Sequence, residues 1–72
     1  MVKFELVDFI DGEYIYNYFP EGDRNDPGQF AITKDGKSRL ISVAKKRNQL
    51  NYYFHAAREV VPGEEKGISA WY

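Results

Sequence analysis

Residues 2–19, VKFELVDFIDGEYIYNYF, decide the fold of this chain. Two stretches rich in β-branched and aromatic side chains, 2–10 and 13–19, flank the dipeptide Asp11-Gly12. Such stretches favour strands, and Asp-Gly is typical of a two-residue hairpin turn in which both residues need a positive φ. The sequence therefore predicts a β-hairpin at the start of the chain.

A two-residue turn also predicts which hairpin side chains share a face, because side chains alternate along a strand. One face would carry Val7, Phe9, Tyr14, Tyr16 and Tyr18, and the other would carry Phe4, Leu6, Ile15 and Phe19. Both faces are apolar, and one short helix can cover only one of them. Tyrosine combines an apolar ring with a hydroxyl that water can solvate, so we expect the tyrosine face to be a partly exposed interaction patch. The alternatives are that the C-terminal segment folds over this face, or that the tyrosines lie at the rim of the sheet.

The rest of the chain predicts three more strands and one helix. Residues 20–28 are breakers and polar residues typical of an exposed loop. Strands are predicted over 29–33 and 38–44, joined by the turn 34–37, and a last strand over 68–72.

The stretch 50–61 fits two structures. Apolar residues at helical spacing predict a helix that packs through Leu50, Tyr53, Phe54, Ala57 and Val61. Pro62 would end it, since proline disfavours helical geometry in the residue before it. Its aromatic and β-branched residues also suit a strand, so that alternative stays open. With the helix, the fold class is α+β: a small, mostly antiparallel sheet in the order ββββαβ with one helix on one face. The predicted core comprises Phe4, Leu6, Ile15, Phe30, Ile41, Phe54 and Trp71.

A helix of the type Tyr53–Arg58 followed by the strand Ile68–Tyr72 resembles short bacterial proteins of uncharacterised function. These share the hairpin-plus-helix layout over most of the chain. The resemblance implies no activity, cofactor or partner.

Size and composition narrow the function classes. The 72 residues predict a single domain, 1–72, with a thin core, and twelve aromatic residues to stock it. There is no cysteine and only one histidine, so we expect no disulfide, metal site or cofactor. No apolar run is long enough for a signal peptide or a membrane span, which predicts a cytoplasmic protein without a membrane partner.

The sequence offers only weak evidence for a catalytic site or a calcium site. His55 could pair with Glu59 one helical turn later, but no serine of the chain stands in a nucleophile motif. The acidic loop 21–26 suggests calcium, yet Lys34 stands where an EF-hand needs glutamate and Arg24 puts a positive charge among the ligands. We therefore expect no catalytic residues.

Positive charge gathers on the second hairpin and just beyond it, at Lys34, Lys37, Arg39, Lys45, Lys46 and Arg47. A net charge of −1 argues against general attraction to nucleic acid, and the sequence has no RNP-type motif, helix-turn-helix pattern or glycine clamp. The leading hypothesis is therefore a non-enzymatic protein-interaction module that self-associates or binds a protein through the tyrosine face. A nucleic-acid-binding accessory protein using residues 34–47 is the alternative.

Overall fold

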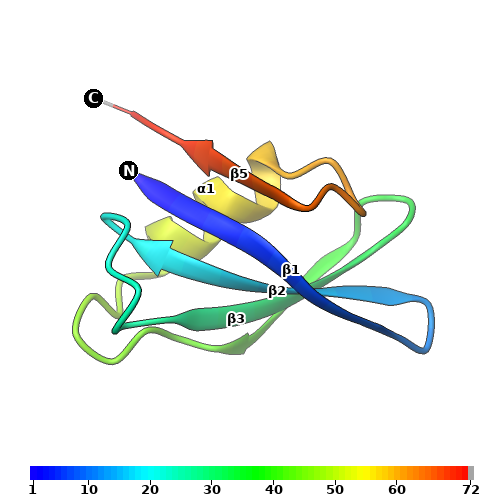
Figure 1. Cartoon of the computed structure of the whole chain (residues 1–72), viewed down its shortest axis with the longest axis horizontal. Helices are drawn as coiled ribbons and strands as arrows, with labels where there is room; N and C mark the ends of the chain where they lie inside the picture. The colour runs from blue at the N-terminus through cyan, green and yellow to red at the C-terminus, as the bar shows by residue number, and fades with distance from the viewer. Residues whose placement is uncertain (72) are drawn as a thin grey trace.

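A computed structural model describes residues 1–71, which form one five-stranded sheet and one helix. The elements are β1 (Val2–Ile10), β2 (Glu13–Pro20), β3 (Gly28–Thr33), β4 (Ser38–Ser42), α1 (Leu50–Glu59) and β5 (Lys66–Ser69). All strand pairs are antiparallel, in the order β4-β3-β2-β1-β5, and α1 lies across one face of the sheet (Figure 1). The predicted α+β class, element order and single helix are confirmed. Tyr72, the end of the predicted last strand, lies outside the described residues.

The first hairpin closes as predicted at its turn. Asp11 and Gly12 both have positive φ, 51° and 79°, and Ile10 pairs with Glu13. These are the angles that a two-residue turn matching the twist of the strands requires.

A β-bulge at Val7 then changes the register. Phe9 faces Tyr14 and Asp8 faces Ile15, but Leu6 faces Tyr16, so Val7 has no partner across the strand pair. An extra residue in one strand shifts every side chain beyond it to the other face. Phe4 and Leu6 therefore join the tyrosines on one face instead of opposing them.

The core lies between this face and α1. Rings from four strand residues fill it: Phe4, Tyr16, Tyr18 and Phe30. Tyr16 stacks on Phe30 at 5.4 Å between ring centroids, and Phe4 meets Tyr16 edge-on at 6.0 Å. Because large rings fill the space above the sheet, the helix approaches it with a small residue, the fully buried Ala56.

The helix is rotated about its own axis relative to the predicted orientation, so that a different face packs on the sheet. Tyr53, Ala56 and Val60 are buried against the sheet, whereas Leu50 and Phe54 are 48% and 52% exposed. Val61 lies beyond the helix and is exposed as well. The hydroxyl of Tyr53 is 2.9 Å from that of Ser38 on β4, which fixes this orientation.

The predicted core is therefore partly right. Phe4, Ile15 and Phe30 are buried, and Leu6 and Trp71 are half-buried beside the core. Ile41 and Phe54 are exposed, so these two predictions are wrong. Ile41 falls at an irregularity in the pairing of β3 with β4, and Phe54 follows the rotation of the helix.

The sheet face away from α1 is polar and charged. Arg39 donates two hydrogen bonds to Glu13, Gln29 donates one to Asn17, and Arg24 pairs with Glu5. The Gln29–Asn17 pair joins neighbouring strands, the Arg39–Glu13 pair spans β3, and Arg24 reaches in from the β2–β3 loop. Of the apolar residues on this face, Ile15, Phe19 and Ala31 are buried, whereas Ile10 and Ile68 are about half exposed. The sheet thus has one apolar face, not the two that the unbulged register predicts.

Candidate functional site

The predicted tyrosine patch is divided by the structure. Tyr16 and Tyr18 are fully buried, so they belong to the core and the predicted exposed patch is wrong for them. The Tyr16 hydroxyl accepts from the backbone N–H of Gly63 and donates to the carbonyl of Glu64, which places the segment after α1 over it. Residues 63 and 64 thus cover Tyr16, as the alternative expected of the C-terminal segment, while α1 packs on the same face.

The other three patch residues stay near the surface at the turn end of the hairpin. Val7 and Phe9 are 49% and 57% exposed, and Tyr14 is half-buried with its ring centroid 4.6 Å from that of Phe9. We call Val7, Phe9 and Tyr14 the hairpin end. It is a remnant of the predicted patch and lacks its two central rings.

A second exposed apolar surface forms where the helix turns away from the sheet. Leu50 and Phe54 lie one helical turn apart, so their side chains are neighbours on one flank of α1. The ring of Phe54 packs at 5.2 Å from that of Tyr53, whose hydroxyl reaches β4. We call Leu50 and Phe54, together with Leu40 on the helix-facing side of β4 beside Phe30, the α1–β4 ledge.

Strand β4 borders this ledge and forms one edge of the sheet. The helix packs mainly on β1, β2, β3 and β5, so Leu40 of β4 stays only partly covered. Ile41 and Val43, in and just after the strand, are also exposed. The sequence prediction includes Leu50 and Phe54 because they occur at helical spacing, but it places them on the buried face of the helix. The sequence signal for the observed orientation is Ala56, because a small residue at this position allows the helix to pack closely on the sheet.

The basic residues of the nucleic-acid alternative do not form one surface. Lys34 and Lys37 lie in the turn before β4, whereas Lys45, Lys46 and Arg47 follow its far end. Between them, the charge of Arg39 is paired with Glu13 at 2.8 Å. The separation by the length of β4 leaves two small groups in place of the predicted cluster.

The backbone of residues 45–47 binds a carboxylate from the chain itself. The carboxylate of Asp26, itself buried, accepts the backbone N–H groups of Lys45, Lys46 and Arg47 at 2.7–3.1 Å. Consecutive N–H groups that converge in this way are typical phosphate-binding nests. Here Asp26 occupies the nest, so this backbone serves to join the β2–β3 loop to the segment before α1.

This bridge predicts a pH effect on stability. Hydrogen bonds from the backbone of Arg47 and then of Lys46 and Lys45 hold the pKa of Asp26 below its usual 3.8. A carboxyl group with a lower pKa in the folded state stabilises the fold at pH above its unfolded value and loses that contribution as pH falls through the folded value. We expect Asp26→Asn to lower the melting temperature at neutral pH, and to lose less stability than the parent between about pH 5 and pH 2. Melting curves of both proteins across this range test it. Parallel curves would contradict the assignment, since Glu5, Glu13 and Glu21 also have lowered pKa values and remain in both.

His55 has a structural partner other than the predicted Glu59. Its ring stacks on that of Trp71, with centroids 3.8 Å apart and planes 3° from parallel. Tyr52 meets the same Trp71 ring at 5.7 Å, so the segment after β5 is packed on the helix. Among residues 1–71, no three histidine, cysteine or acidic side chains gather in a geometry that could hold a metal ion.

The described helix is too short to cross a membrane. Comparisons of the chain with protein-family models, with curated proteins and with solved structures gave no match.

Proposed function

We propose that this protein is a small, non-enzymatic interaction module that binds through the α1–β4 ledge, and that its partner is a second copy of the chain. The observation that carries the proposal is the exposure of Leu50 and Phe54 on a helix whose opposite side is well packed. Exposed aromatic and aliphatic groups that lie together are typical of interaction sites, whereas singly scattered ones need no explanation.

The edge strand beside the ledge supports a second copy as the partner. Edge strands carry unpaired backbone N–H and C=O groups, and proteins commonly protect them with lysine, proline or unpaired charge. The five residues of β4 include no lysine, proline or acidic residue, and their single charge, Arg39, is paired with Glu13. Within the strand itself, two copies of β4 could therefore approach each other in a symmetric contact without an unpaired like charge, and the lysines that flank β4 lie beyond its ends.

The ledge and the hairpin end can be separated by a matched pair of variants. Phe54 and Phe9 have similar exposure, 52% and 57%, and lie on different surfaces. We expect Phe54→Ser to weaken self-association by about 2 kcal/mol, roughly thirtyfold in dissociation constant, because aromatic anchors dominate small interfaces. Phe9→Ser should leave it unchanged. Sedimentation over a wide concentration range measures both, with melting curves to verify folding.

Two outcomes would contradict this proposal. A parent protein that stays monomeric at millimolar concentration rules out the second copy as partner. A dimer that Phe9→Ser dissociates and Phe54→Ser does not would move the interface to the hairpin end.

A further inference from the structure

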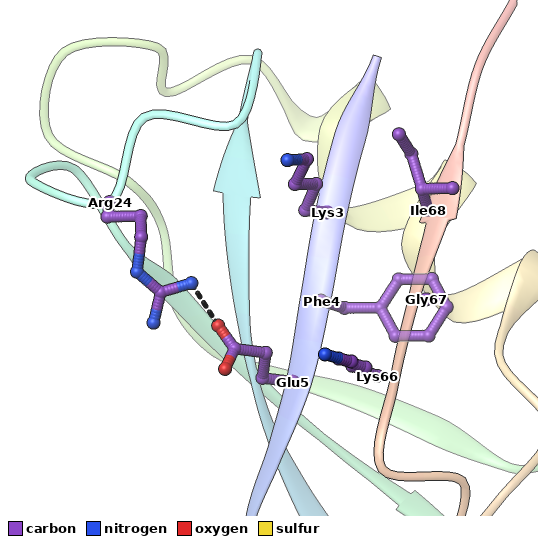
Figure 2. A pocket seen from close by; sticks show the side chains of 7 residues that line it. All are labelled: Lys3, Phe4, Glu5, Arg24, Lys66, Gly67 and Ile68. Atoms are coloured by element: carbon purple, nitrogen blue, oxygen red, sulfur yellow. Dashed lines mark hydrogen bonds and ion pairs between the residues drawn. The ribbon is translucent and has the colours of Figure 1, made fainter.

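A shallow basin lies on the sheet face opposite α1, where β1 pairs with β5. Its floor is the paired backbone of these strands, and its volume is about 420 Å³. Its walls are the side chains of Lys3, Glu5, Arg24, Lys66 and Ile68 (Figure 2). The basin is thus separate from the α1–β4 ledge, so a ligand could bind there whether or not the chain self-associates.

The basin carries three cations and one carboxylate. Glu5 is committed to Arg24, whose hydrogen bond lowers the pKa of Glu5, with further lowering by the nearby charges of Arg24, Lys66 and Lys3. Within residues 1–71, Lys3 and Lys66 make no ion pair. Two positive charges therefore remain uncompensated in the basin of a protein whose net charge is −1.

The fold holds the side chain of Arg24 in place. The guanidinium of Arg24 lies over the ring of Phe19, 4.6 Å from its centroid, while it pairs with Glu5. The loop that carries Arg24 is tied down by Asp26, and the stem of Lys3 runs beside Gly22 of the same loop. Groups held in position before binding lose less conformational entropy when a ligand arrives.

We propose that this basin binds a small phosphate monoester. Such a group carries a charge of about −1.5 to −2 at neutral pH, which matches the two uncompensated lysines. Arg24 adds a planar donor group of the kind that suits phosphate oxygens. Ile68, half-exposed and paired in register with Lys3, offers an apolar wall for the organic part of the ester. The volume lies in the range of small-molecule sites.

The probe is phenyl phosphate, titrated into isotopically labelled protein and followed by amide chemical shifts. We expect saturable shifts at Lys3, Gly67 and Ile68, with affinity that falls as salt is added. Phenyl sulfate, with one negative charge, should bind more weakly, and inorganic phosphate should also bind more weakly because it cannot contact Ile68. Benzyl alcohol, which is neutral, should not bind.

The variant Lys3→Gln/Lys66→Gln should weaken phenyl phosphate binding about tenfold. Lys34→Gln/Lys37→Gln, which removes the same charge from the turn before β4, should leave it unchanged. The proposal fails if phenyl phosphate causes no saturable shift in the basin, or if the two double variants lose affinity equally. It also fails if phenyl sulfate binds as tightly as phenyl phosphate, since charge matching would then have no part in the site.

Discussion

Phe30→Ala is expected to destabilise the protein by about 3–5 kcal/mol, which is the typical cost of truncating a fully buried phenylalanine to alanine in other proteins. Phe30 has no exposed surface, and its ring contacts those of Tyr16, Tyr18 and Tyr53. Removing it leaves a cavity at the point where strand and helix rings meet. At about 0.05–0.15 kcal/mol per residue, a chain of 72 residues has a total stability of roughly 4–11 kcal/mol. The loss therefore removes a large share of this stability, and the melting temperature should fall steeply.

Phe54→Ala is the matched control for this experiment. Half of the Phe54 side chain is in water, so its truncation should lower the melting temperature far less than that of Phe30. Denaturant unfolding of the two variants and the parent measures the difference. Equal losses would mean that Phe54 is packed in the core, as the sequence alone suggested, and that the α1–β4 ledge does not exist.

Gly28→Ala should destabilise the protein by about 1–3 kcal/mol, although alanine suits a strand better than glycine does. A Cβ atom at position 28 would overlap the ring of Tyr18, which lies against this glycine and is fully buried. The φ angle of Gly28 is not positive, so the cost comes from the ring and not from the backbone.

A double-mutant cycle separates these two causes. In a Tyr18→Leu background, the shorter side chain leaves room for the added methyl group, and Gly28→Ala should then cost little. If the penalty is the same in both backgrounds, Tyr18 is not its source. Thermal unfolding of the four proteins supplies the comparison.

The sequence predicts the strands and the first turn well because these depend on local preferences. Asp11-Gly12 specifies the turn, and the aromatic stretches around it specify two strands. The face assignment fails because it assumes an unbroken alternation. In the sequence, Val2, Phe4 and Leu6 occupy even positions and Phe9 an odd one. The shift of the apolar residues from even to odd positions is compatible with a β-bulge between Leu6 and Phe9. That the extra residue is Val7 depends on which strand pairing buries the most aromatic surface across three strands.

The predicted orientation of α1 fails for a similar reason, because it also depends on long-range packing. Its apolar residues span more than one face, and periodicity favours the face with the largest side chains. The sheet selects a different face, because rings from Phe4, Tyr16 and Phe30 already fill the space and leave room for Ala56. The same errors affect the surfaces proposed as sites: Tyr16 and Tyr18 of the predicted patch belong to the core, and Phe54 of the predicted core lies on the α1–β4 ledge. Neither outcome follows from residue types alone, since each depends on long-range packing.

The pairing of the first strand with the last has a consequence for biosynthesis. β1 lies between β2 and β5, and Val2 pairs with Ser69, so the sheet joins residues from opposite ends of the chain. Contacts between residues so distant in sequence slow folding, because a long loop must close before they form. A nascent chain, made from its N-terminus, can form the β1–β2 hairpin early, but the other edge of β1 stays open until residues 66–69 emerge. During that interval the protein exposes an aromatic strand edge with unpaired backbone groups, so we expect incomplete chains to aggregate more readily than the whole chain.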